Sequence, residues 1–225
     1  QTFHANAIKE INARKQPNDF ILHSFGYGTK AIADAIPELI NVEMGIGYGD
    51  SWAQWRVYES HSVMNAQYGK EAVNHCQQNW YWRVIPNYFD DNDFQYSEEK
   101  QDYILYLGRI GKNKGVDIAI DACQRAGKRL YIAGQGSLKD LGYTEATYPK
   151  FVTELGYAPP DYRRSLLSNA TALFIASTYL EPFAGVQVEA WLSGTPVISP
   201  DWGAFAEMNI HGVTGFRCHT MKEFV

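Results

Sequence analysis

The sequence predicts an α/β protein with two Rossmann-like, doubly wound domains, each built on a parallel β-sheet. Three observations favour this class. Short runs of β-branched and aromatic residues alternate with segments in which apolar residues recur at helical spacing. Glycine-containing turns follow several of these runs. Hydrophobic residues make up 45% of the 225 positions and charged residues 20%, which is typical of a globular protein.

The second half of the chain has the more regular pattern. Its apolar runs have the character of strands buried on both faces of a parallel sheet, and they lie at 103–107, 129–133, 153–157, 172–176, 196–199 and 215–218. Between them, helical periodicity is found at 116–125, 161–170 and 185–192. Strands that alternate with helices in this way predict βαβ units and a parallel sheet.

The first half is less regular. We expect helices at 5–13, 29–36 and 55–68, strands at 20–25 and 39–44, and a further segment at 81–85. Residues 86–100 contain proline, several acidic residues and few apolar ones, as interdomain connectors do. We therefore expect a first domain at 1–89 and a second at 90–225.

Composition and charge exclude several function classes. A formal net charge of −5 argues against binding to nucleic acid, which needs clustered positive charge. No apolar run approaches the roughly 18 residues of a membrane span, so we expect a cytoplasmic protein, or one peripheral at the inner membrane face. The wide spacing of Cys76, Cys123 and Cys218 favours free thiols over a disulfide framework or a zinc site.

The strongest functional signal is a pair of glutamates around a strand-to-helix turn. Glu181 precedes the turn, and Glu189 lies eight positions later, about two turns along the predicted helix. A helix N-terminus at the carboxyl edge of a parallel sheet is an anion site, and small residues at Ala184 and Gly185 let a diphosphate approach the backbone. One carboxylate can then address a sugar and the other a ribose. The alternative is a helix-start carboxylate and a solvated helix residue.

A second signal is the basic loop 108–115, which directly follows the predicted strand 103–107. Arg109 offers a planar fork for phosphate and Lys114 a mobile point charge, so together they can neutralise a diphosphate. The glycines at each end, Gly108 and Gly115, allow tight backbone geometry. The loop lacks the G-x-x-x-x-G-K-[ST] pattern of nucleotide hydrolases. Taken alone, a solvated basic loop is an equally good interpretation.

In their order and spacing, these segments resemble the retaining glycosyltransferases of family 4, which have the two-domain GT-B fold. The resemblance covers nearly the whole chain. It rests on the segments IPNYFD at 85–90, YLGR at 106–109, KG at 114–115, YIAGQG at 131–136, LGY at 155–157, EPFAGVQVE at 181–189, SGTPVI at 193–198 and GVTG at 212–215.

The resemblance implies a donor site for a nucleotide-diphosphate sugar. In such a site the loop residues Gly108, Arg109 and Lys114 hold the diphosphate. Tyr157 ends the strand beside the nucleotide base. The partner at this site is the nucleotide sugar, and the acceptor is an unidentified glycan, lipid or small molecule.

The glutamate turn supplies the rest of the implied site. Glu181 contacts the transferred sugar and acts in catalysis, whereas Glu189 binds the ribose hydroxyls. Phosphate or sugar oxygens accept hydrogen bonds from the backbone amides of Phe183, Ala184, Gly185 and Val186. Ala184 departs from the glycine more usual in the family, which keeps a small side chain but restricts the backbone.

His23 is the candidate catalytic residue of the first half. It lies in the predicted strand 20–25, where many family members place a histidine near the transferred sugar. A histidine at the end of a strand is otherwise hydrogen-bonded scaffolding, and this alternative remains open.

The implied activity is transfer of a sugar from a nucleotide-diphosphate donor with retention of anomeric configuration, without a metal or other cofactor. Two alternatives share the fold. One is a GT-B nucleotide-sugar epimerase, which needs different acidic and histidine groups. The other is a nucleotide-sugar-binding protein without catalysis.

The resemblance also implies a chain truncated at both ends. The sequence opens on a predicted helix, without the first strand and glycine-rich turn of the acceptor-side domain, and stops before the closing helices. An incomplete first domain leaves an apolar sheet face uncovered. We therefore expect that a homodimer can form through this face.

Overall fold

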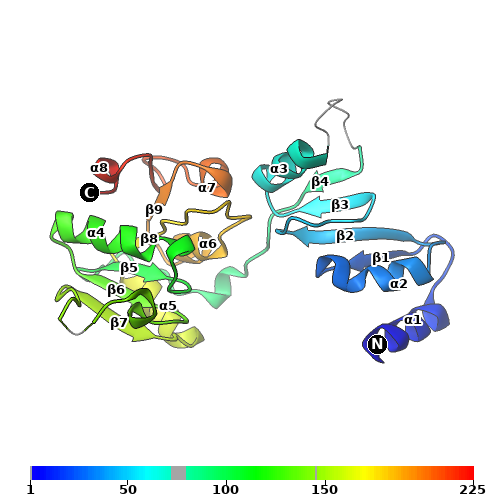
Figure 1. The fold of residues 1–225 in the computed structure, drawn as a ribbon, viewed down its shortest axis with the longest axis horizontal. Coiled ribbons are helices and arrows are strands. Elements are labelled where there is room, and N and C mark those ends of the chain that lie inside the picture. The colour runs from blue at the N-terminus through cyan, green and yellow to red at the C-terminus, as the bar shows by residue number, and fades with distance from the viewer. Residues whose placement is uncertain (1, 72–79, 145) are drawn as a thin grey trace. The chain divides into compact units, whose positions relative to one another are not determined.

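The structure is a computed structural model that describes residues 2–71, 80–144 and 146–225. Within it the chain divides into two compact units, unit 1 (Gln1–Asn87) and unit 2 (Tyr88–Val225). Each unit has its own parallel sheet (Figure 1). The α/β class with parallel sheets is therefore confirmed. Cys76, which the sequence predicts to be a free thiol, lies outside the described residues.

Unit 1 is built on a four-stranded sheet in the order β1-β2-β3-β4, with every neighbouring pair parallel. The strands are β1 (Phe20–His23), β2 (Ile40–Ile46), β3 (Trp55–Tyr58) and β4 (Trp82–Val84). The helices are α1 (Thr2–Arg14), α2 (Lys30–Ala35) and α3 (His61–Glu71), with a short 3-10 turn at Gly26–Thr29.

One face of the unit 1 sheet carries the packed core. Ile21 packs with residues of α1 and α2, and Tyr58 and Trp82 pack with Val63 of α3. Because successive side chains of a strand point to opposite faces, the neighbours of Ile21 face the other way. On that second face, exposed apolar side chains are contributed by Phe20, Leu22, Ile40 and Met44.

The expectation of one helix over 55–68 is wrong in its first part, because Trp55–Tyr58 is strand β3 and the helix begins at His61. Side chains in β3 alternate between half-buried and buried, which is the period of a strand. Aromatic and β-branched residues suit this position between two parallel neighbours. Pairing across the sheet therefore overrides the helical pattern of this segment.

Unit 2 is built on a six-stranded parallel sheet in the order β10-β9-β8-β5-β6-β7. Each of the six strands predicted for this half is present, and the observed bounds are β5 (Ile104–Leu107), β6 (Leu130–Ala133), β7 (Val152–Gly156), β8 (Ala172–Phe174), β9 (Val197–Pro200) and β10 (Gly215–Cys218). The helices are α4 (Val116–Ala126), α5 (Pro160–Asn169), α6 (Gly185–Leu192), α7 (Gly203–Met208) and α8 (Met221–Phe224). Short 3-10 turns lie at Asp91–Asp93, Lys112–Lys114 and Leu138–Leu141.

Apolar clusters cover both faces of the unit 2 sheet. Ile104 and Tyr106 belong to the cluster formed with α4, whereas Leu105 belongs to the cluster formed with α5 and α6. This alternation along β5 is what a strand buried on both faces requires. Among the helices of the described segments, none is both long and apolar enough to traverse a lipid bilayer.

Strand order reverses at β5 in unit 2. From β5 the chain goes outward through β6 and β7, and then returns through α5 to place β8 on the other side of β5. In open parallel sheets, the crevice at the carboxyl ends of two such strands is the usual ligand position. The loops after β5 and β8 therefore meet where a ligand is expected.

Candidate active site

The loops after β5 and β8 bring together a lysine and a glutamate that lie far apart in sequence. Lys114 Nζ is 2.5 Å from Glu181 Oε1, and Ser177 Oγ donates to the same oxygen at 2.7 Å. Lys114 Nζ also donates to the Tyr179 hydroxyl at 2.6 Å. Glu181 is buried, with a relative exposure of 6%. The structure thus joins two predicted site residues in one polar cluster, to which Ser177 and Tyr179 are additions that the sequence did not predict.

The cluster favours the charged form of Lys114. Burial lowers the pKa of this ammonium, but hydrogen bonds to Glu181 and Tyr179 and the nearby carboxylate charge outweigh that effect, so the net shift is upward. Burial also raises the pKa of Tyr179. The cluster therefore contains a persistent positive charge beside a carboxylate, at a position where a diphosphate could replace the carboxylate as partner.

Close backbone contacts fix the loop after β5. A Cβ atom on Gly115 would lie 1.9 Å from the carbonyl oxygen of Ala176, and one on Gly134 would lie 1.8 Å from that of Gly108. Both glycines have positive φ. Arg109 is exposed, and its guanidinium makes no hydrogen bond or ion pair with the described residues. The loop thus presents Arg109 to solvent from a rigid base.

Helix α6 begins at Gly185, where the helical periodicity at 185–192 predicts it. Ala184 precedes it in the left-handed region, with φ 59° and ψ 64°, a conformation that is costly for a residue with a Cβ. Phe183 is buried, so only its backbone can meet a ligand. The first amides of α6, among them those of Gly185 and Val186, lack intrahelical partners and can serve an anion.

Glu189 lies in the second turn of α6 and is held by an arginine from α5. Arg163 Nε donates to Glu189 Oε2 at 2.6 Å, and the Nη2 atom of Arg163 also pairs with Oε2. The sequence did not predict this arginine as part of the site. Tyr157, directly after β7, is 70% exposed, so its ring face is accessible.

His23 lies in unit 1 and is buried. Its Nε2 atom is 2.7 Å from Asn41 Oδ1, so Nε2 carries the proton in this arrangement. The ring also makes an edge contact with Trp52, with centroids 5.2 Å apart. Both of these contacts lie within unit 1.

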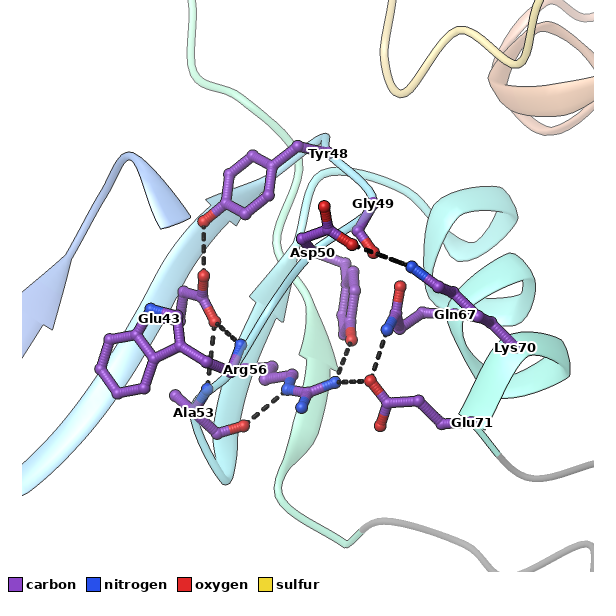
Figure 2. A network of polar contacts seen from close by, with 11 residues as sticks. Glu43, Tyr48, Gly49, Asp50, Ala53, Arg56, Gln67, Lys70 and Glu71 are labelled. Atoms are coloured by element: carbon purple, nitrogen blue, oxygen red, sulfur yellow. Dashed lines mark hydrogen bonds and ion pairs between the residues drawn. The ribbon is translucent and has the colours of Figure 1, made fainter. Parts of the chain in front are cut away.

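A second buried polar network lies in unit 1, and the sequence did not predict it (Figure 2). Glu43 of β2 is fully buried and accepts from the Tyr48 hydroxyl at 2.8 Å and from the amides of Trp52 at 2.8 Å and Ala53 at 3.2 Å. Next to it, buried Arg56 of β3 donates to the Ala53 carbonyl at 2.6 Å. These bonds fix the loop between β2 and β3.

Arg56 continues the network to helix α3. Its Nη1 atom lies 2.6 Å from Glu71 Oε1, and Gln67 donates to the same oxygen. The guanidinium also lies over the Trp82 ring, 4.6 Å from its centroid. The available sequence signal was a glutamate, Glu43, inside the predicted strand 39–44. Within the described ranges, no group of three or more acidic, histidine or cysteine side chains has the arrangement of a metal site.

The family model for glycosyl transferases group 1 matches residues 89–223, which cover most of unit 2. The chain therefore belongs to this family of glycosyltransferases. The match includes the Lys114 and Glu181 cluster, the start of α6 and Glu189.

Curated relatives match over about half of the chain. An uncharacterized glycosyltransferase of Methanocaldococcus jannaschii is 34% identical over 126 residues, which are 52% of this chain and 32% of the relative. A glycogen synthase of Mycobacterium tuberculosis is 34% identical over 123 residues, 51% of this chain and 30% of the relative. The matched part thus spans about a third of the length of these relatives.

Solved structures confirm the fold over nearly the whole chain. Anabaena HepE, in a complex with UDP and glucose, aligns with a TM-score of 0.76 at 18% identity over 98% of this chain and 69% of its own. AviGT4, a glycosyltransferase involved in avilamycin A biosynthesis, aligns with a TM-score of 0.72 at 21% identity over 97% of this chain and 66% of its own. The predicted GT-B type of fold is confirmed by these similarities.

Proposed function

We propose that the chain transfers a sugar from a nucleotide-diphosphate donor to an acceptor with retention of anomeric configuration. One observation carries the proposal: Lys114 and Glu181, from the loops on either side of the β5 and β8 switch point, meet beside the N-terminus of α6. Positive charge and unpaired amides there suit a diphosphate, and a buried carboxylate suits a sugar. Structural neighbours solved with UDP, glucose or UDP-glucose support this choice of ligand.

In this proposal unit 2 binds the donor. Arg109 and Lys114 neutralise the diphosphate, the amides from Phe183 to Val186 hold its oxygens, and Tyr157 lies beside the base. When the donor binds, Lys114 exchanges the carboxylate of Glu181 for a phosphate oxygen. Glu181 is then released from one of its two hydrogen-bond donors and can accept from a sugar hydroxyl.

The proposed reaction needs little covalent chemistry from the protein. The bond between the anomeric carbon and the diphosphate oxygen breaks, and the acceptor oxygen bonds to the same face of that carbon. The acceptor proton goes to the departing phosphate, whose growing charge Lys114 and Arg109 stabilise. In this scheme no step uses a metal.

The proposal is tested in two stages. Thermal unfolding is first measured with UDP, GDP and ADP, because a ligand at 100 times its Kd adds about 2.7 kcal/mol of stability. Donors of the bound nucleotide are then incubated with the protein, and the anomeric configuration of the released or transferred sugar is read by NMR. Hydrolysis or transfer with retention is expected.

Other outcomes would favour the alternatives. An epimerised nucleotide sugar would indicate an isomerase, and nucleotide binding without donor turnover would indicate a binding protein. Failure to bind any of the three nucleotides would contradict the proposal as a whole.

We also propose that unit 1 supports a homodimer. The exposed side chains of Phe20, Leu22, Ile40 and Met44 share one face of its sheet, and apolar patches of this kind mark association surfaces. Light scattering should show a dimer that Leu22→Lys weakens, whereas a monodisperse monomer at high concentration would contradict this proposal.

A further inference from the structure

Glu189 is held at one oxygen and open at the other. Arg163 directs both its Nε and Nη2 atoms at Oε2 of Glu189, with Nε at 2.6 Å. Two N–H groups can satisfy both lone pairs of one carboxylate oxygen. Oε1 makes no hydrogen bond or ion pair with the described residues. The carboxylate is therefore fixed in orientation and keeps one acceptor atom for a ligand.

Burial makes this arrangement asymmetric. The Glu189 side chain is 15% exposed, whereas that of Arg163 is 39% exposed. The carboxylate is thus mostly shielded from water. Without the arginine, an unpaired charge at this position would be costly, so the side chain would adopt a rotamer that exposes it to solvent. The guanidinium is planar and rigid, so it sets the plane of the carboxylate as well as neutralising its charge.

The neighbouring arginine provides a contrast on the same helix. Arg164 lies 3.6 Å from Asp93 and 3.5 Å from Asp161, and both aspartates are largely exposed. Such loose surface pairs contribute little to stability. Arg163 differs in having a short, two-point contact with a shielded carboxylate.

We propose that Arg163 is a positioning residue, which orients Glu189 so that Oε1 accepts a hydrogen bond from a ribose hydroxyl of the nucleotide. This inference rests on the proposed function, because it assumes that Glu189 binds the ribose. Arg163 itself does not touch the nucleotide. Its effect on affinity is transmitted through Glu189 and therefore depends on the ribose hydroxyls.

The experiment compares a nucleotide with its analogue that lacks the ribose hydroxyls. Calorimetry on the full chain uses whichever of UDP, GDP and ADP binds the wild type most tightly, together with its 2′,3′-dideoxy analogue. The variants are Arg163→Leu, Arg163→Lys, Glu189→Gln and the double variant Arg163→Leu/Glu189→Gln. Arg164→Leu, on the same helix, is the matched control.

Arg163→Leu should raise the Kd of the ribonucleotide about tenfold, equivalent to about 1.4 kcal/mol, and leave that of the dideoxy analogue unchanged. The double variant should bind no more weakly than Glu189→Gln, because the two residues act through one contact. Arg164→Leu should bind both ligands as the wild type does. Arg163→Lys keeps the positive charge but lacks the two-point guanidinium contact, so it should lose part of the ribonucleotide affinity. This variant replaces Arg163→Leu in the comparison if the leucine variant does not fold.

Equal losses for the two ligands, or additive losses in the double variant, would overturn the role of Arg163 while leaving the proposed function intact. Absence of binding to all three nucleotides by the wild type would instead overturn the proposed function, and this inference with it.

Discussion

The two units each contain a buried carboxylate in a polar network, but the networks are built in opposite ways. Glu43 of unit 1 is fully buried and is held by two backbone amides and a tyrosine from one loop. Glu181 of unit 2 is held by the side chains of Lys114 and Ser177. A carboxylate bound by fixed backbone groups stabilises a fold, whereas one bound by exchangeable side chains can change partners when a ligand arrives.

The largest expected effect follows substitution of Glu181, the carboxylate that is held by side chains. Glu181→Gln keeps the volume and removes the charge, so donor turnover should fall by about 10²- to 10³-fold, as when one electrostatic contact to a transition state is lost. Affinity for the free nucleoside diphosphate should not fall, because Glu181 contacts the sugar and its substitution frees Lys114 for the phosphate. Steady-state rates and calorimetry check both parts. Glu154→Gln, elsewhere in unit 2, is the control; a Glu181 variant with wild-type turnover would place the glutamate outside the reaction.

The next largest effect follows substitution of Glu43, the carboxylate that is held mainly by backbone amides. Glu43→Ala leaves the Trp52 and Ala53 amides and the Tyr48 hydroxyl without their acceptor, and each such group costs about 1 kcal/mol or more. Unit 1 should lose about 3 kcal/mol of unfolding free energy, measured in urea by tryptophan fluorescence. Nucleotide binding should not change. If Glu43→Ala weakened nucleotide affinity and left stability intact, the contrast between the two networks would be wrong.

A smaller effect is expected for the cations of the unit 2 loop. Arg109→Ala and Lys114→Ala should each weaken binding of a nucleoside diphosphate by about 1.5 to 3 kcal/mol, because charge-assisted contacts to phosphate are lost. Binding of the nucleoside alone should change far less. Lys112→Ala, in the same loop, is the control for general charge. Equal losses for nucleoside and diphosphate would point to a folding defect.

The smallest effect is a pH dependence of unit 2. Burial raises the pKa of the Cys123 thiol to about 12, whereas an unfolded cysteine ionises at about 8.5. Above about pH 8.5 the unfolded chain releases a proton that the folded chain retains, so this contribution to stability is complete below that pH and declines above it, by at most about 1.4 kcal/mol per pH unit. Urea unfolding between about pH 8 and 10 should show this slope. Cys123→Ala should reduce this slope, and the remainder should include Cys218, because burial also raises the pKa of its thiol to about 11. An unchanged slope would assign it to other groups.

Sequence periodicity predicted unit 2 better than unit 1 for a physical reason. Strands of unit 2 such as β5 are covered on both faces, and they appear in the sequence as continuous apolar runs. β3 of unit 1 contains Arg56, whose burial depends on Glu71 and Trp82 far along the chain. A buried arginine in a strand has no local signature, so the periodicity of this segment predicts a helix instead.

The same distinction applies to the candidate site. Arg109, Lys114 and Glu181 lie in loops after strands, and Glu189 lies in the second turn of the helix that follows. Motif spacing is sufficient to select these four residues. Arg163 could not be selected in this way, because its importance comes from the packing of α5 against α6. Ser177 and Tyr179 are intermediate in how well the sequence predicts them. They are polar residues between the end of a strand and the motif residue Glu181, and this position is itself a signal for a site residue.

The contact between Lys114 and Glu181 also has a consequence for folding. It joins residues 67 positions apart, and it can form only after β8 has paired with β5 on the side opposite β6. Pairing of β5 with β6 closes a much shorter loop and is entropically cheaper, so it should come first. The two halves of the proposed site therefore come together only when the sheet is completed, and we expect affinity for a diphosphate to appear in that late step.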